Sequence, residues 1–183
     1  EAAYISYAPD LAMPGATDTI QAFVDRAKRR GVRRLVLLSG RGEAEAQACE
    51  RIVQESGLEW TVVRASWFFQ NFSEGAFADM VHAGRIALPA GDTPEPFVDV
   101  DDIADVAIAA LSEPGHAGEV DEVTGPRLMT FTDIASDDGE VMVSAVDPRR
   151  LVGIADNEAL DSIANEVHDR FDRVLASVGT ELE

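Results

Sequence analysis

The sequence predicts an α/β protein in which helices cover both faces of a parallel sheet, followed by a smaller α/β piece made of a strand and a helix. The short apolar run at residues 35–38, and the strand-forming segment TVVRA at residues 61–65, are typical of strands buried on both faces. Segments of helical period separate these runs and are long enough to keep successive strands parallel. The pattern changes near Ser136, so we expect a first domain over residues 1–135 and a second over residues 136–183.

Three strands and two helices are expected in the first 65 residues. A strand over residues 1–9 contains Tyr4, Ile5 and Tyr7, which favour extended structure, and it ends at Pro9. The helices that precede and follow the strand at 35–38 are expected to end at Gly31 and Gly57. Their predicted buried residues are Ile20, Phe23, Val24 and Ala27 in the first helix, and Cys49, Ile52 and Val53 in the second.

The remainder of the chain continues the alternation. We expect a helical stretch over residues 72–84, a proline-containing loop up to residue 100, and a helix that Asp102 caps together with Asp105. A last strand over residues 119–125 completes the first domain. The second piece contains a strand after the turn at Asp138–Gly139 and an amphipathic helix over residues 157–178.

Small residues at the end of one strand and aromatic residues after another indicate a ligand site. Open α/β sheets bind ligands at the carboxyl ends of their strands, where Ser39 and Gly40 are expected. An ordinary strand-to-helix turn explains this pair equally well. The aromatic residues that follow the next strand could line a pocket or belong to the core, and both interpretations remain open. They are Trp67, Phe68, Phe69 and Phe72.

Other candidate groups have simpler explanations, so we expect no metal site and assign no catalytic residue. Helix capping explains Asp99, Asp101 and Asp102 better than cation binding does. The three histidines are scattered, and Cys49 lies on an apolar helix face as an inert core thiol. The sequence contains no glycine-rich dinucleotide loop and no Tyr-x-x-x-Lys pair after the Ser39 strand.

Composition limits the environment and the partners. A net charge of −19, from 34 acidic and 15 basic residues, argues against binding nucleic acid. The single cysteine favours a reducing compartment. No apolar run approaches the roughly 18 residues of a membrane span. We therefore expect a cytoplasmic protein that binds neither nucleic acid nor membrane.

Several segments, taken together, resemble the NmrA-like atypical short-chain dehydrogenases/reductases. They are YAPDLAMPGA, RRLVLLSGRGEAE, ESGLEWTVVRASWFFQNF, FVDVDDIADVAIAAL and EVTGPRLMTFTDIA, which span about residues 3–135. The resemblance implies part of a Rossmann-like NAD(P)-binding fold, in a family that includes quinone and azo-dye reductases and catalytically silent redox sensors. The cofactor-binding residues that it implies are Tyr7, Ala8, Pro9, Ser39, Gly40, Ala65, Ser66, Trp67, Phe68 and Asn71.

Two departures from this family shape the expectation. Its first three strands, with the glycine-rich loop, should precede Glu1, so we expect a truncated domain with weak or absent NAD(P) binding. The tail over about residues 138–178 resembles the end of an uncharacterised bacterial family, domain of unknown function 302, which suggests a fusion of two partial domains.

Three functional hypotheses follow from this resemblance and from the predicted sheet. The first is an NAD(P)-linked oxidoreductase that acts on a small-molecule substrate. The second is a non-catalytic NAD(P) sensor. The third is an interaction protein that forms a homo-oligomer through the exposed edge strand at residues 4–8.

Overall fold

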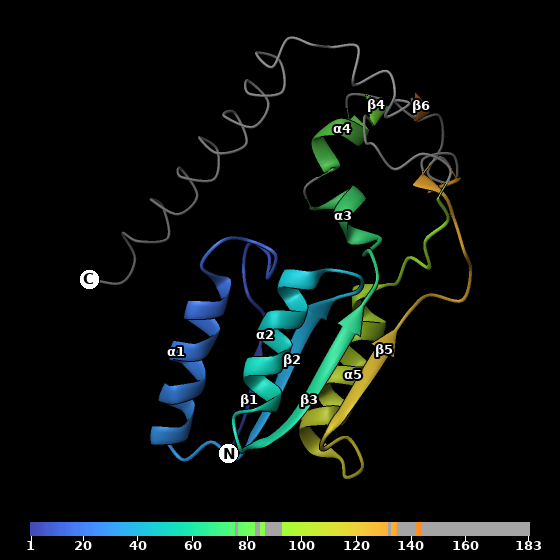
Figure 1. Cartoon of the computed structure of the whole chain (residues 1–183). Coiled ribbons are helices and arrows are strands. Elements are labelled where there is room, and N and C mark those ends of the chain that lie inside the picture. The colour runs from blue at the N-terminus through green and yellow to red at the C-terminus, as the bar shows by residue number, and fades with distance from the viewer. Residues whose placement is uncertain (76, 83–84, 87–92, 132, 135–141, 144–183) are drawn as a thin grey trace. The chain divides into compact units, whose positions relative to one another are not determined.

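A computed structural model of the chain describes residues 1–75, 77–82, 85–86, 93–131, 133–134 and 142–143 (Figure 1). The chain divides into two compact units, and all the described residues belong to the first, which comprises Glu1–Ala87 and Asp92–Ser144. The predicted helix over residues 157–178 lies outside the described residues. The predicted domain boundary near Ser136 also lies outside them and remains a prediction.

A four-stranded parallel sheet forms the centre of the described unit, which confirms the predicted fold class. Its strand order is β1-β2-β3-β5, so β1 lies at one edge. In the register of the two central strands, Ser39 lies opposite Arg64 and Gly40 opposite Ala65, which brings the carboxyl ends of β2 and β3 to the same level. The strands are β1 (Ala2–Ile5), β2 (Arg34–Gly40), β3 (Glu59–Ala65) and β5 (Glu119–Val123). A separate parallel pair joins β4 (Arg85–Ile86) to β6 (Met142–Val143).

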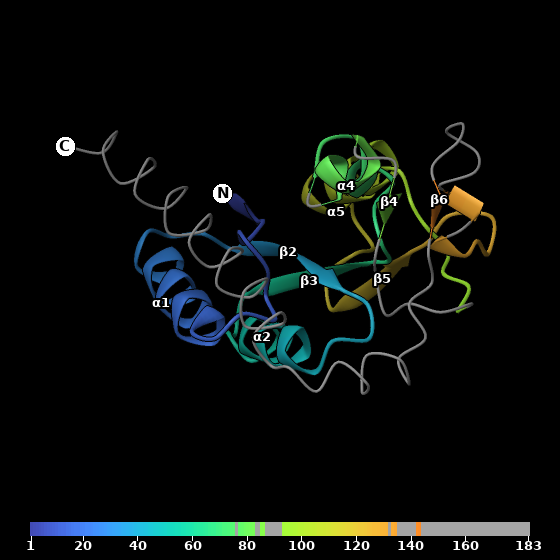
Figure 2. The same ribbon diagram turned by 90° about the horizontal axis from the view of Figure 1, so that it is seen from above.

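Helices cover both faces of this sheet, as Figure 2 shows from above. On one face, α1 (Ala16–Arg29) and α2 (Ala44–Gln54) pack against Leu35 and Leu37 of β2. On the other face, α5 (Val100–Ser112) packs against Val36. Successive side chains of a strand point to opposite faces, so the apolar run of β2 supplies both cores. This two-sided burial explains why its sequence does not alternate with polar residues.

Three local predictions were inaccurate. The helical stretch after Asn71 is two short helices, α3 (Gln70–Ser73) and α4 (Ala78–His82), because the chain turns tightly at Gly75. A Cβ on Gly75 would lie 2.8 Å from the Cα of Asn71. Asp99, rather than Asp102, caps α5, and its Oδ1 accepts a hydrogen bond from the backbone N–H of Asp101 at 2.9 Å. Phe23 was predicted to be buried, but it is 38% exposed. None of the helices that the structure describes is both long and apolar enough to cross a membrane.

Candidate functional site

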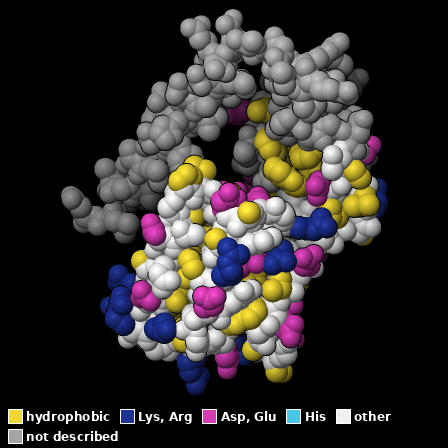
Figure 3. Space-filling view, in the orientation of Figure 1, with side chains coloured by type: hydrophobic (Ala, Val, Ile, Leu, Met, Phe, Trp, Pro, Cys, Tyr) yellow, Lys and Arg dark blue, Asp and Glu magenta, His cyan; other side chains and the backbone are white. Residues whose placement is uncertain are grey.

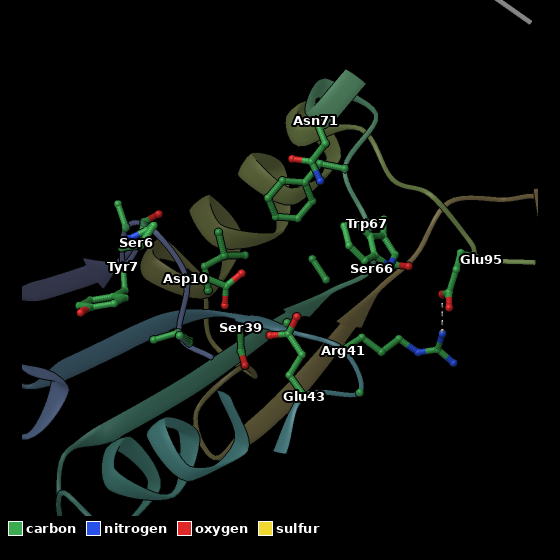
Figure 4. Close-up of a pocket in the computed structure, with 18 residues that line it drawn as sticks. Ser6, Tyr7, Asp10, Ser39, Arg41, Glu43, Ser66, Trp67, Asn71 and Glu95 are labelled. Carbon is green, nitrogen blue, oxygen red and sulfur yellow. Dashed lines mark ion pairs between the residues drawn. The ribbon is translucent and has the colours of Figure 1, made fainter. Parts of the chain in front are cut away.

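A pocket of about 580 Å³ lies at the carboxyl ends of β1, β2 and β3 (Figure 4). Its walls come mainly from the segments that directly follow these three strands, as expected for an open parallel sheet. The volume lies within the range of small-molecule sites in proteins. The lining residues are Ser6, Tyr7, Ala8, Pro9, Asp10, Leu11, Leu38, Ser39, Gly40, Arg41, Gly42, Glu43, Ala65, Ser66, Trp67, Phe68, Asn71 and Glu95.

The structure brings together all ten residues that the sequence indicated for cofactor binding. Tyr7 to Pro9, Ser39 with Gly40, Ala65 to Phe68, and Asn71 all line this one pocket. Sequence reasoning missed the charged residues among their neighbours, namely Asp10, Arg41, Glu43 and Glu95. Asp10 and Arg41 directly follow predicted positions along the chain, and Glu43 lies three residues after Gly40. Glu95 is 24 residues from Asn71, and no local pattern in the sequence connects it to the pocket.

A buried carboxylate holds the hydroxyl of Ser39. Ser39 is 4% exposed, and its Oγ donates a hydrogen bond of 2.7 Å to Oε1 of Glu50, which is 2% exposed on α2. Arg64 of β3 donates to the same carboxylate, from Nε at 3.0 Å and from a terminal nitrogen at 2.6 Å. Burying a carboxylate is costly unless a cation and hydrogen bonds compensate it, and here both are present.

Arg64 extends this network toward the surface. Its other terminal nitrogen donates to Glu122 of β5 at 3.0 Å, and the hydrogen bond to Glu50 is the main reason that its pKa lies above the usual arginine value. Arg41 lines the pocket. Its Nη1 lies 3.8 Å from Oε2 of Glu95, and its Nε lies 3.9 Å from Oε2 of Glu122. Both guanidinium groups are therefore engaged by carboxylates of the protein itself.

The aromatic residues after β3 serve both purposes that were left open. Trp67 and Phe68 line the pocket, and Trp67 is 41% exposed. The Trp67 ring also packs against Phe77 and Phe131, with centroid distances of 5.8 and 5.5 Å. Phe69 and Phe72 instead contact Phe97, and Phe72 is 3% exposed. The first two residues of the group form a wall of the pocket, Phe72 belongs to the core, and Phe69 is partly buried beside Phe97.

Two carboxylates in the pocket have no cation close to them among the described residues. Glu43 lies just before α2, and burial raises its pKa, with smaller contributions from the negative charges of Asp10 and Glu45. Its carboxylate covers Gly40, where a Cβ would lie 2.5 Å from Oε2. Asp10 accepts a hydrogen bond of 2.8 Å from the backbone N–H of Ala12. In Figure 4 the Asp10 and Glu43 carboxylates lie on the same side of the pocket as Ser39, while Arg41 points toward Glu95.

One hydroxyl in the wall of the pocket lacks a hydrogen-bond partner within the described part of the chain. Ser66 is 6% exposed and lines the pocket, yet its buried Oγ makes no hydrogen bond there. A buried hydroxyl without a partner is costly, so a ligand or a water molecule is needed to satisfy it.

The remaining candidate groups are a cysteine, the aspartates near α5 and the histidines. Cys49 is fully buried, and burial, followed by the charge of Glu50, raises its pKa. No group of three or more potential metal ligands occurs in the described ranges of the chain. Asp99 caps a helix, as noted above, and His116 contacts Asp121 at 2.8 Å.

Comparisons with known proteins identify relatives for most of the chain. It is 32% identical to an NAD(P)H azoreductase of Xenophilus azovorans over 158 residues, which cover 80% of this chain and 54% of the relative. It is 37% identical to an agroclavine dehydrogenase of Claviceps fusiformis over 134 residues, which cover 69% of this chain and 45% of the relative. The chain therefore spans about half the length of the curated relatives that it matches.

A solved structure and a family model complete the comparison. The fold matches that of an NADPH-dependent quinone oxidoreductase of Escherichia coli, solved with NADPH, with a TM-score of 0.62 and 23% identity, covering 78% of this chain and 53% of the other. The family model described as "Domain of unknown function DUF302" matches residues 134–178. Both resemblances seen in the sequence are thus confirmed: most of the chain is related to NAD(P)-dependent reductases of the NmrA-like kind, and its last part matches domain of unknown function 302.

Proposed function

We propose that this chain is an NAD(P)-linked oxidoreductase module of the quinone or azo reductase type, and that its pocket receives the nicotinamide end of the cofactor. The observation that carries the proposal is the convergence of three strand-end segments on one pocket at the place where open α/β sheets bind ligands. The names of the relatives support the reaction class, since they include an NAD(P)H azoreductase and an NADPH-dependent quinone oxidoreductase.

The lining residues suit one part of the cofactor better than another. Ser66 offers a hydroxyl without a partner, and Trp67 and Phe68 offer an apolar wall for a flat ring. The described lining offers the diphosphate no comparable partner, because its guanidinium, that of Arg41, is already paired with Glu95 and Glu122. We therefore expect weak binding. When bound, the cofactor supplies the hydride, and the protein orients the ring and limits the access of water.

Direct binding measurements test this proposal. Isothermal titration of the chain with NADPH and NADH should give weak binding, with a dissociation constant on the order of 0.1–1 mM, because only the ring end is held. Ser66→Val should weaken the binding by removing the unpartnered hydroxyl, whereas Ser112→Val should not, because Ser112 lies at the end of α5 and is not among the lining residues. The absence of heat at millimolar cofactor would refute cofactor binding by this chain.

Turnover separates a reductase from a sensor. A reductase consumes NADPH steadily when a quinone or an azo dye is added, whereas a sensor binds the dinucleotide without consuming it. Because no catalytic side chain is assigned, cofactor orientation alone must support the reaction. Binding without any turnover across both acceptor classes would favour the sensor.

We also propose that the free edge of β1 mediates association between copies of the chain. β1 pairs only with β2 in the described sheet, and Tyr4 on this strand is 40% exposed. An unpaired strand edge offers backbone hydrogen-bonding groups to another strand. Light scattering should show a mass that rises with concentration, and Tyr4→Lys should reduce the rise. A strictly monomeric mass would refute the proposal.

A further inference from the structure

The charges that line the pocket do not balance. Three carboxylates, those of Asp10, Glu43 and Glu95, share the lining with one guanidinium, that of Arg41. Arg41 points to Glu95 and to Glu122, so its charge is already compensated at the mouth of the pocket. Asp10 and Glu43 also line the pocket, and neither forms an ion pair with a residue in the described ranges. Figure 3 shows acidic and hydrophobic side chains gathered at the upper end of the described unit.

The surroundings of Glu43 disfavour its ionised carboxylate. It is only partly exposed, and burial and the neighbouring charges of Asp10 and Glu45 disfavour its ionised form. Neutralisation by a cation inside the pocket would remove both penalties. The Glu43 side chain also forms no capping hydrogen bond with α2.

The lining contains both donors and acceptors of hydrogen bonds, but its unpaired charges are all negative. Ser39 donates its hydroxyl proton to Glu50, so its oxygen lone pairs remain available to a ligand. The carboxylates of Asp10 and Glu43 accept only. Ser66, whose Oγ has no partner in the described part of the chain, can donate or accept, as can the side chains of Ser6, Tyr7 and Asn71. The two unpaired carboxylates therefore favour a ligand that is positively charged.

An aromatic face completes the site. Trp67 is 41% exposed and lines the pocket, while Phe77 and Phe131 support its ring from within the unit. A tryptophan face attracts cations through its ring quadrupole and stacks well on flat ligands. The support from two phenylalanines fixes the ring before a ligand arrives, which lowers the entropic cost of binding.

We infer that this pocket is a binding site for a flat aromatic cation, with Trp67 as its stacking surface and Glu43 and Asp10 as its counter-ions. Two sources share this chemistry: the oxidised nicotinamide ring, which carries a positive charge, and a separate cationic aromatic substrate. The inference does not require a bound dinucleotide, so it stands or falls separately from the proposed reductase activity.

Two fluorescent probes of opposite charge test the inference on the intact chain. Thioflavin T is a flat aromatic cation, and 8-anilinonaphthalene-1-sulfonate is an aromatic anion of similar size. Thioflavin T should bind more tightly than the anionic probe. Glu43→Gln should weaken thioflavin T binding about fivefold, and Trp67→Leu by a similar factor. Neither residue is a member of the core clusters of α2 and β3, but Trp67 contacts the buried Phe131, so circular dichroism first checks that both variants fold.

A matched control and a competition experiment complete the design. Glu55→Gln removes the same charge at the opposite end of α2, away from the pocket, and should leave thioflavin T affinity within about twofold. Competition by oxidised NADP would assign the cation site to the nicotinamide ring, and simultaneous binding would assign it to a separate substrate. Equal effects of Glu43→Gln and Glu55→Gln, or tighter binding of the anionic probe, would overturn the inference. If NADPH fails to bind while thioflavin T still binds in a Glu43-dependent way, the cation site stands and the reductase proposal fails.

Discussion

Replacing Arg64 by methionine should destabilise the chain more than any other change to the charged network. Glu50 has a side chain that is only 3% exposed, and Arg64 supplies both of its charged hydrogen bonds. Without Arg64, the buried carboxylate keeps only the hydroxyl of Ser39. Leaving a buried charge without its partner costs about 3 kcal/mol. The Arg64 side chain itself is 21% exposed, so its own removal from the sheet surface adds little.

Two further variants in the same network allow the loss of stability in Arg64→Met to be compared with smaller losses. Glu50→Gln keeps the shape and the bond from Ser39 but removes the charge, and we expect a loss of about 1.5 kcal/mol because Arg64 retains Glu122. Glu122→Gln should cost about 0.5 kcal/mol or less, because the Glu122 side chain is 51% exposed. Combining Arg64→Met with Glu50→Gln should cost less than the sum of the two losses, because the double variant no longer buries an unpaired charge.

Urea unfolding followed by tryptophan fluorescence measures these differences, with Trp60 in β3 as a reporter. In thermal unfolding, a loss of about 3 kcal/mol corresponds to roughly 6–12 °C for a domain of this size. An Arg64→Met protein within about 0.5 kcal/mol of the wild type would refute the reasoning. Strict additivity of the two single losses would do the same.

Three other predictions concern the pocket and its surroundings. The pKa of Glu43 is raised in the folded state, so its ionised carboxylate destabilises the fold fully above that pKa and no longer does so once the pH falls below the unfolded value of 4.5. The free energy of unfolding should therefore gain a contribution from Glu43 as the pH falls through this window, and Glu43→Gln should remove that contribution. Thioflavin T affinity should fall over the same window, because the carboxylate loses its charge. Gly125→Ala should lower the free energy of unfolding in urea by about 2 kcal/mol, because a Cβ there would overlap the backbone oxygen of Phe97. Gly40→Ala should lower it less, because the added Cβ meets only the end of the flexible Glu43 side chain. Cys49 is fully buried with a raised pKa, so Ellman's reagent should react with it only after urea unfolds the chain, and a rapid reaction in native buffer would contradict its place in the core.

The strands and the long helices were predictable because their signals are local. Apolar runs of four or five residues fit β2 and β3, and glycines mark the ends of α1 and α2. The break between α3 and α4 was not predictable, because it depends on the close approach of Gly75 to Asn71. The cap of α5 was misplaced by three residues, since several aspartates in a row offer equivalent local signals.

The positions of Ser39, Gly40 and the aromatic residues after β3 followed from a general rule and the other site residues from the family resemblance, but neither indicated the charges around them. Ser39, Gly40 and the residues after Ala65 were predicted to lie at strand ends, and the structure brings them to one pocket. Glu50 was missed because a glutamate between Cys49 and Arg51 reads as a solvated helix residue. Arg64 could have indicated a buried carboxylate partner such as Glu50. A charged residue inside the buried segment TVVRA needs a partner of opposite charge, and that partner must come from a neighbouring helix or strand.

Glu43 and Glu50 lie close together along the chain but have different roles: one carboxylate is paired within the fold, and the other lines the pocket without an ion pair to any described residue. Glu50 lies within α2, whereas Glu43 is the extended residue directly before the helix begins. Glu50 lies against β3 and is neutralised there by Arg64, which fixes the hydroxyl of Ser39 and completes the core. Glu43 lies beyond the strand ends, where the sheet offers no guanidinium to pair with it. A carboxylate that is compensated within the fold stabilises it, whereas one that is left uncompensated in a pocket is available to a cation. The substitutions Glu50→Gln and Glu43→Gln should therefore separate cleanly, with the first lowering stability and the second lowering cation affinity.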